Sequence, residues 1–239
     1  MKIKAILFDS GMVLTKPASG HWMITLNFFE YVNKKGFYSF TKKQREKAFA
    51  LAMKHVRNDL TLKNQEEEVK LFTKYYQMFF ETLGMMIPKD NYELIAKDMV
   101  YTFGKFSFYE DAKDVIPRLS KLYDLGVVSD AYTSLNQVYE EVDYKKYFKT
   151  FMVSSEVGCL KPEKEIYMKA ITSLLLEPEA CAYIDDKLIN CDGAKAVGIK
   201  TRFLLCRSYI SYLYFKIKCK DHIVLRNLYE LEKHLEKIS

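Results

Sequence analysis

The feature that most constrains the fold is a short apolar run that ends on a carboxylate and a glycine. Residues 4–14 read Lys-Ala-Ile-Leu-Phe-Asp-Ser-Gly-Met-Val-Leu. The apolar residues before Asp9 predict a buried strand, and Gly11 predicts a sharp turn directly after it. In open α/β sheets, ligands bind at the edge formed by the carboxyl ends of the strands. Asp9 is therefore a candidate catalytic residue, although a strand that ends in a capping aspartate would give the same pattern.

Beyond residue 108, short apolar runs alternate with segments of helical pattern. The runs that predict strands lie at 125–128, 150–153, 181–184 and 200–205. Strands that alternate with helices at this spacing predict a parallel sheet built from right-handed crossover connections. The stretch 208–220 is different, because its apolar residues alternate with lysines. That alternation predicts an edge strand, in a surface hairpin or at a dimer contact.

The segment between the first strand and these later strands has a helical pattern. Its apolar side chains recur at i, i+3, i+4 and i+7, and its aromatic stripe is most simply the core of a helical bundle. Thr41 and Gln44 have the spacing of a capping box at the start of one helix. We therefore predict an α/β protein whose core is formed by residues 1–15 and 108–239, with a helical insertion at 16–107.

Charge, cysteine content and hydropathy narrow the class of protein. The net charge of +6 is spread over the chain without a continuous basic stripe, so we expect no nucleic-acid partner. We also expect a cytoplasmic protein with no membrane partner, because no apolar run could cross a bilayer and no secretory signal precedes Asp9. The expected oligomeric state is a monomer or a homodimer. The five cysteines lack the C-x-x-C spacing of zinc sites, and their odd number is typical of a reducing compartment.

Polar side chains follow three of the predicted strands and would meet at one edge of the sheet. Besides the carboxylate of the first strand, these are Ser129 and the adjacent pair Asp185 and Asp186. Pro162 can open a helix, so we expect the helix to start after it and Lys161 to lie just before the helix N-terminus. Carboxylates, a hydroxyl and an ammonium group in one crevice are typical of a site for Mg²⁺ and a phosphoryl group. Each of these residues alone could be a helix cap or a surface charge.

These residues resemble the sequence motifs of the haloacid dehalogenase (HAD) superfamily, and the likeness extends over nearly the whole chain. Residues 8–14 are similar to the first motif, 127–130 to the second, 158–162 to the third and 183–198 to the fourth. The resemblance implies a Rossmann-like parallel sheet core, with the helical insertion after the first motif serving as an α-helical cap domain.

The resemblance also implies a nucleophile and a metal site. Asp9 would attack phosphorus and form an aspartyl-phosphate. Mg²⁺ would be bound by Asp9, by the backbone carbonyl of Gly11 and by Asp185. Asp186 would bind the metal or hold a water molecule on it, and Asn190 would orient this acidic pair.

Further residues would bind the substrate by the same resemblance. Ser129 would donate a hydrogen bond to a phosphoryl oxygen, and Lys161 would pair with the nucleophile and the phosphate. Asp130, next to Ser129, belongs to the same substrate-binding group. In the cap, His21 and Trp22 are candidate substrate contacts, although Trp22 could equally be cap core and His21 a surface residue.

One position departs from the family pattern. Most phosphatases of this superfamily carry a second aspartate two residues after the nucleophile, as a general acid and base, and here that position is Gly11. Such a group contributes about 10²–10⁴-fold to the rate, so a leaving group of low pKa, such as an anomeric hydroxyl or an acyl phosphate, would need it least. The sequence predicts a Mg²⁺-dependent phosphatase acting on a small phosphorylated metabolite. Two alternatives remain open: a catalytically weak or inactive HAD-fold binding protein, and, less favoured by the acidic pair, a 2-haloacid dehalogenase.

Overall fold

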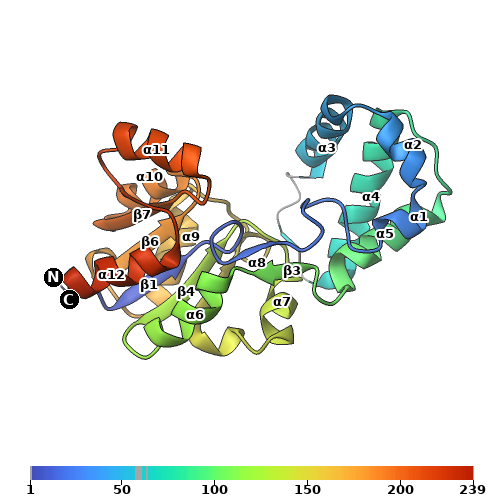
Figure 1. Ribbon diagram of the computed structural model, residues 1–239. Helices are drawn as coiled ribbons and strands as arrows, with labels where there is room; N and C mark the ends of the chain where they lie inside the picture. Colours follow the sequence, from blue (N-terminus) through green and yellow to red (C-terminus); the bar gives the residue numbers. More distant parts are fainter. Residues whose placement is uncertain (1, 57–60, 63, 239) are drawn as a thin grey trace. The chain divides into compact units, whose positions relative to one another are not determined.

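The chain divides into two compact units (Figure 1). The computed structural model describes residues 2–56, 61–62 and 64–238. Unit 1 comprises residues 1–16, 107–131 and 142–239, and unit 2 comprises residues 17–106 and 132–141. The second unit therefore includes α7 (Leu135–Glu141), a helix that lies outside the predicted insertion.

Unit 1 contains a six-stranded parallel sheet. Its strands are β1 (Ala5–Phe8), β4 (Asp124–Ser129), β5 (Phe148–Val153), β6 (Cys181–Asp185), β7 (Thr201–Leu205) and β8 (Ile223–Leu225). The strand order is β5-β4-β1-β6-β7-β8, and every neighbouring pair is parallel. The chain builds β4 and β5 on one side of β1 and then crosses to β6 on the other. The carboxyl end of β1 is thus a topological switch point, where open sheets form ligand crevices, and the predicted α/β class is confirmed.

Helices cover both faces of this sheet (Figure 1). On one face, α9 (Lys164–Ser173) and α10 (Leu188–Ala196) bury their apolar side chains against Leu7 and Tyr183. On the other, α6 (Glu110–Leu119) contacts α12 (Leu228–Ile238), and His234 of α12 packs edge-on against Phe203 of β7 at 5.4 Å between ring centroids. Phe203 neighbours Ile184 in the parallel register, so it points away from the Tyr183 face.

The predicted edge strand at 208–220 is wrong, because this stretch forms α11 (Tyr209–Lys218). Tyr212, Phe215 and Cys219 recur at helical spacing and pack against a buried cluster. That cluster consists of Cys191, Leu204, Cys206 and Val224. The alternation with lysines covers only a few residues, and the helical spacing of the packed side chains overrides it. The edge of the sheet is instead β8.

The helix predicted after Pro162 is confirmed as α9. Helix α9 begins at Lys164, and Glu163 is the residue that precedes its first turn. Lys161 and Pro162 lie in a turn of the loop before this helix, in which the Glu163 N–H donates to the Leu160 carbonyl at 2.8 Å. This loop follows the short helix α8 (Ser154–Val157).

The longer segment of unit 2, residues 17–106, is mainly helical. The helices of unit 2 are α1 (Phe28–Tyr31), α2 (Lys34–Ser39), α3 (Lys42–Val56), α4 (Gln65–Leu83), α5 (Asp90–Tyr101) and α7. The aromatic stripe forms the core of this unit, as predicted, with Phe49 and Phe79 stacked at 4.1 Å. The capping box is also confirmed, since the Thr41 N–H donates to Gln44 Oε1 at 2.8 Å and the Gln44 N–H donates to Thr41 Oγ1 at 3.3 Å.

A small two-stranded sheet, formed by β2 (Thr15–Pro17) and β3 (Phe106–Phe108), lies where the chain passes between the units. Among the described residues, no helix is both long and apolar enough to cross a membrane.

Candidate active site at the edge of the parallel sheet

Three aspartates meet at the carboxyl end of β1 and β6. Each of Asp9, Asp185 and Asp186 offers one carboxylate oxygen, and these three atoms lie within 4.8 Å of one another. The strand register brings them together, because the Asp9 N–H donates to the carbonyl of Ile184, the residue before Asp185, at 2.9 Å. Carboxylate oxygens are the ligands that Mg²⁺ prefers, so the donor set suits a divalent cation.

Lys161 supplies a positive charge at the centre of this cluster. Its Nζ donates to Asp9 Oδ1 at 2.6 Å, to Asp185 Oδ2 at 2.8 Å and to the Val128 carbonyl at 3.1 Å. Burial alone would lower the pKa of this ammonium group, but attraction to Asp9 and Asp185 outweighs it and raises the pKa above its ordinary value. Lys161 therefore carries a positive charge at neutral pH.

Asp185 has the most hydrogen-bond donors of the three aspartates. Besides Lys161, it accepts from Tyr183 Oη at 2.6 Å, from the Lys187 N–H at 2.8 Å and from Asn190 Nδ2 at 3.1 Å to either oxygen. Burial raises the pKa of Asp185, but Lys161 and these donors more than reverse that effect and hold it below its usual range. The sequence analysis did not single out Tyr183, although its place two residues before Asp185 in a strand puts both on one face.

The pKa values of Asp9 and Asp186 are raised, whereas that of Asp185 is lowered. Burial raises the pKa of Asp9 to about 7, with Lys161 opposing the rise and the charge of Asp185 adding to it. Burial and then repulsion from Asp185 raise the pKa of Asp186 to about 6. The cluster thus carries more negative charge than Lys161 can offset. A divalent cation would supply the missing positive charge, so the residues present fit a metal site.

Asn190 is placed by the close approach of α10 to the loop that carries Lys161. A Cβ added at Gly193 would lie 2.7 Å from Cβ of Pro162 and 2.9 Å from Tyr167 Oη, so only glycine fits there. Tyr167 Oη in turn donates to the Asn190 carbonyl at 2.9 Å. This contact holds the start of α10, and with it the side chain that donates to the acidic pair.

Two neighbouring residues at the end of β4 have different surroundings. Ser129 is buried directly after Val128, whose carbonyl accepts from Lys161. Asp130 Oδ1 accepts the backbone N–H of Lys161 at 2.8 Å, so this carboxylate holds the loop that carries the lysine. Burial raises the pKa of Asp130, against the attraction of Lys161.

Arg207 fixes the turn after Gly11, and nothing in the sequence pattern singled it out. Its Nε donates to the Met12 carbonyl at 3.0 Å and its Nη2 to the Val13 carbonyl at 2.6 Å. The same guanidinium pairs with both carboxylate oxygens of Asp111, at 3.0 and 3.1 Å. Met12 has a φ of 60°, a left-handed conformation that costs energy for a residue with a side chain. Arg207 holds the carbonyl of this strained residue in place.

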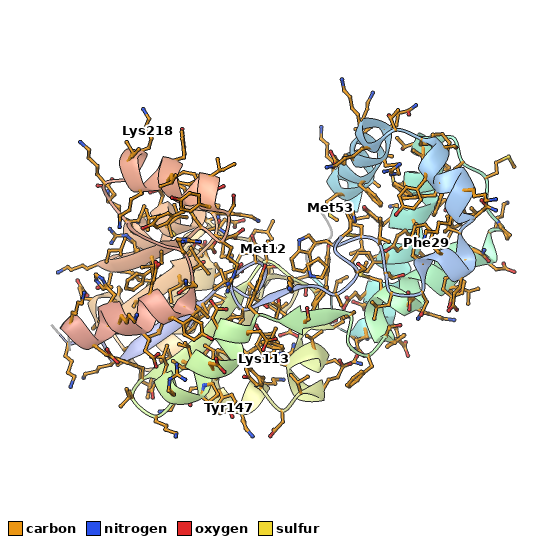
Figure 2. All side chains as sticks on the ribbon, viewed as in Figure 1. Met12, Phe29, Met53, Lys113, Tyr147 and Lys218 are labelled. Atoms are coloured by element: carbon orange, nitrogen blue, oxygen red, sulfur yellow. The ribbon has the colours of Figure 1, made fainter. Side chains whose placement is uncertain are left out.

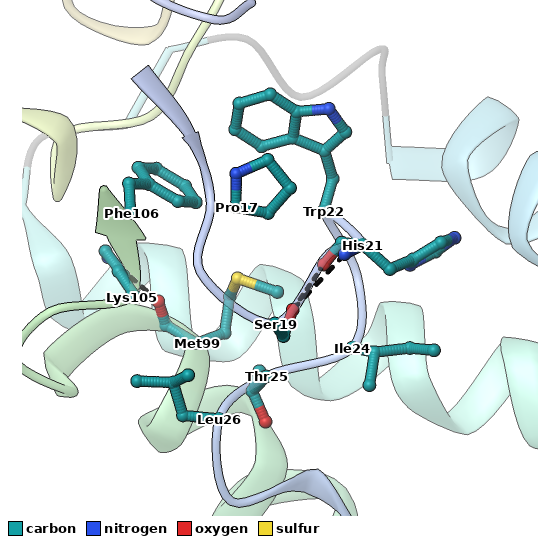
Figure 3. Close-up of a pocket in the computed structure, with 10 residues that line it drawn as sticks. All are labelled: Pro17, Ser19, His21, Trp22, Ile24, Thr25, Leu26, Met99, Lys105 and Phe106. Atoms are coloured by element: carbon teal, nitrogen blue, oxygen red, sulfur yellow. Dashed lines mark hydrogen bonds between the residues drawn. The ribbon is translucent and has the colours of Figure 1, made fainter. Parts of the chain in front are cut away.

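His21 and Trp22 lie in unit 2 and line a small pocket there (Figure 3). The Trp22 indole packs edge-on against Phe106, with 5.1 Å between ring centroids. His21 Nδ1 accepts the Met23 N–H at 3.1 Å, and burial lowers the pKa of its imidazole. Their role as substrate contacts stays a prediction.

One family model matches most of the chain. The model of haloacid dehalogenase-like hydrolases matches residues 8–204. The glyceraldehyde 3-phosphate phosphatase of Methanopyrus kandleri is 29% identical over 144 residues, which make up 57% of this chain and 62% of that protein. The match therefore spans less than two thirds of the length of this relative.

Solved structures of the same type cover nearly the whole chain. A HAD phosphatase from Thermococcus onnurineus has a TM-score of 0.63 and 21% identity, with 98% of both chains covered. The magnesium-bound structure of the Bacillus subtilis protein YfnB, assigned to the HAD hydrolases, has a TM-score of 0.69 and 14% identity, with coverage of 99% and 100%. At these identities the likeness shows the fold.

Proposed function

Because the chain belongs to the haloacid dehalogenase-like hydrolase family, we propose that it is a Mg²⁺-dependent phosphatase of small phosphorylated metabolites. The proposal is carried by one observation, the contact of the Lys161 ammonium with both Asp9 and Asp185 inside an acidic cluster. A nucleophilic carboxylate and a phosphate repel each other. A lysine and a divalent cation at this place would offset that repulsion.

The substrate class is supported by the Methanopyrus relative, whose name gives a phosphorylated three-carbon compound as its substrate. We assign the catalytic core to residues 1–15 and 108–239 and the cap to 16–107, with His21 and Trp22 on the cap side. Helix α7 packs with the cap helices and would belong functionally to them.

Asp9 carries the covalent chemistry in this mechanism. A carboxylate oxygen of Asp9 bonds to phosphorus, and the bond from phosphorus to the leaving oxygen breaks with its electron pair. A water molecule then attacks phosphorus, which releases inorganic phosphate and regenerates the carboxylate. Lys161 holds the carboxylate in place, and Ser129 donates to a phosphoryl oxygen. When bound, Mg²⁺ would withdraw negative charge from the phosphoryl group.

The metal would be held by Asp9, Asp185 and Asp186, together with the backbone carbonyl of Gly11. Of these, Asp185 is ionised without the cation, since its pKa lies below its usual range. The pKa values of Asp9 and Asp186 are raised, and a bound cation would lower both and so favour the ionised carboxylates. Asn190 orients Asp185 through two hydrogen bonds.

Gly11 restricts the leaving group. A glycine cannot protonate the leaving oxygen, so the favoured substrates are those whose leaving oxygen departs as an anion. Acyl phosphates and phosphates on an anomeric hydroxyl meet this requirement, since their leaving groups have a low pKa.

A binding protein without turnover is the second candidate, and Gly11 is the observation that favours it. A 2-haloacid dehalogenase is disfavoured by the acidic cluster, because displacement of halide from carbon by a carboxylate needs no metal.

Release of inorganic phosphate from a panel of acyl phosphates, sugar phosphates and nucleotides, with and without Mg²⁺, tests the proposal. We expect metal-dependent turnover that Asp9→Asn lowers by at least about 10³-fold. Asp124→Asn is the matched control, since Asp124 lies at the opposite end of the sheet and pairs with Lys149. Equal rates for the wild type and Asp9→Asn would exclude Asp9 as the nucleophile. Absence of turnover on every substrate, with phosphate still bound, would favour the binding protein.

A further inference from the structure

Helix α11 exposes an apolar face. Seven of its ten residues are Tyr, Ile, Leu or Phe, yet none of its residues is buried. The exposed large side chains are Tyr209, Ile210, Leu213, Tyr214 and Ile217, with 44–80% of each accessible. At 3.6 residues per turn these positions fall within an arc of roughly 140°. A continuous apolar strip of this kind marks an interaction site more often than scattered exposed residues do.

The strip is distinct from the face by which α11 packs on the protein. Tyr212, Phe215 and Cys219 lie on the other side of the helix and contact the buried cluster around Leu204. The helix is therefore anchored in unit 1 through one face and presents the second face outward. Within the strip, Tyr209 also contacts unit 1, because the Arg226 guanidinium lies 5.1 Å from its ring centroid. Ile210 and Ile217 are 80% and 75% exposed and lie away from the anchoring face, so they can be changed without loss of the fold.

Lysines border the apolar strip on both sides. Lys216 lies at one border of the arc and Lys218 at the other, and both are exposed (Figure 2 labels Lys218). Lys220 follows the helix, and residues 207–220 contain no Asp or Glu. The first acidic residue after the helix, Asp221, already pairs with Lys195 at 2.9 Å. The charge around the strip is thus positive.

We propose that α11 lies on membrane surfaces that contain anionic lipids. An apolar strip between two lysines is the arrangement of a helix that lies in the lipid interface, with the lysine stems on the hydrocarbon and the ammonium groups at the headgroups. A second copy of the chain fits less well, because two such helices would bring Lys216, Lys218 and Lys220 together without an acidic partner. The absence of a membrane-spanning run does not bear on a helix of this type.

The proposal is independent of the phosphatase function, and it implies weak, reversible binding. A ten-residue helix offers little apolar area, so attraction between lysines and anionic headgroups has to contribute. Binding should therefore require anionic lipid and decrease with salt, since exposed charges are screened over about 10 Å at about 0.1 M salt.

Co-sedimentation of the full chain with vesicles tests this. We expect binding to vesicles of phosphatidylcholine with phosphatidylglycerol, and at least about tenfold weaker binding to phosphatidylcholine alone. The double variants Ile210→Ser/Ile217→Ser and Lys216→Glu/Lys218→Glu should each weaken binding at least about tenfold. The control Leu122→Ser/Leu175→Ser changes two leucines that are 74% and 90% exposed elsewhere in unit 1, and it should bind as the wild type does.

Three results would overturn the proposal. The first is that the chain sediments equally with and without anionic vesicles. The second is that the leucine control loses as much binding as the α11 variants do. The third is that light scattering shows a dimer, which Ile210→Ser/Ile217→Ser dissociates, while the wild type does not bind vesicles. The last result would assign the strip to a second copy of the chain. Circular dichroism and thermal unfolding of each variant separate a lost surface from a lost fold.

Discussion

Lys161 in unit 1 and Lys105 in unit 2 are the buried lysines of the described residues, and their pKa values are shifted in opposite directions. Lys161 lies between the carboxylates of Asp9 and Asp185. Lys105 donates to neutral groups, the Met99 and Val100 carbonyls at 2.8 Å each and Ser134 Oγ at 2.7 Å. Burial lowers the pKa of Lys105 to about 8, and the carboxylate of Glu68 opposes that shift only in part.

The difference shows what a buried ammonium group does in each unit. Lys105 caps the end of α5 and reaches Glu68 only through Ser134, whose Oγ donates to that carboxylate. Carbonyls satisfy its hydrogen bonds without offsetting its charge, so it joins structural elements. Lys161 contacts two carboxylates, those of Asp9 and Asp185, so the negative charge around it exceeds its single positive charge. An excess of buried negative charge is unfavourable in a purely structural role and is expected at a site that binds a cation.

Removal of the Lys161 charge should have the largest effect. Lys161→Met leaves Asp9 and Asp185 buried without a compensating cation, which costs about 3–5 kcal/mol of unfolding free energy. Phosphate release should fall by at least about 10³-fold. Urea unfolding measures the loss of unfolding free energy, and the phosphate assay measures the loss of activity. A variant as stable and active as the wild type would remove the contrast with Lys105.

The second prediction concerns pH and Lys105. Its folded pKa of about 8 lies below the unfolded value of 10.5, so the unfolded chain binds more protons between these two pH values. The unfolding free energy should therefore rise with pH across this window, relative to Lys105→Met, by up to about 3 kcal/mol. Urea unfolding at both ends of the window measures the change, with the exposed Lys54→Met as control. The prediction would be contradicted if the difference in unfolding free energy between the wild type and Lys105→Met stayed constant or fell as the pH rises.

Arg207 is an intermediate case, because its partners are both a carboxylate, Asp111, and the Met12 and Val13 carbonyls. Arg207→Met should release the turn after Gly11 and weaken Mg²⁺ binding about tenfold, or about 1.4 kcal/mol. Calorimetric titration with Mg²⁺ measures this without turnover.

Arg202→Met is the matched control for this variant. Arg202 also donates to backbone carbonyls, those of Lys200 and Asp221, but on a different loop. If both variants bound Mg²⁺ equally well, the turn would be held without the guanidinium.

The smallest effect is expected at Tyr183, a neutral donor in the charged cluster. Tyr183→Phe removes the hydrogen bond to Asp185 Oδ2 and leaves Lys161 on the same oxygen. We expect a loss of about 1 kcal/mol of unfolding free energy, with activity lowered less than tenfold. Tyr167→Phe, which removes the bond to the Asn190 carbonyl, is a comparison of equal chemistry. If Tyr183→Phe lowered the unfolding free energy more than Lys161→Met does, the hydrogen bond would contribute more than the charge, contrary to this prediction.

Several elements of this protein follow from the sequence alone. The apolar run before Asp9, the strands that end near Ser129 and Asp185 and the capping box at Thr41 all depend on residues close together in the chain. Local periodicity and side-chain chemistry are sufficient for such elements. Because parallel strands end at one edge, the sequence also predicted that Asp9 and Asp185 would lie together, as they do.

Tertiary structure decided the remainder. Arg207 contacts the turn after Gly11 across more than 190 positions, and Lys105 is defined by a serine 29 residues away. No local pattern records such contacts. The stretch 208–220 alternates like a strand, and only its packing against Leu204 and its neighbours selects the helix. Local pattern is a weak preference of a few tenths of a kcal/mol per residue. Partial burial of two aromatic side chains contributes about 25 cal/mol for each Å² of apolar surface removed from water, which is enough to override it.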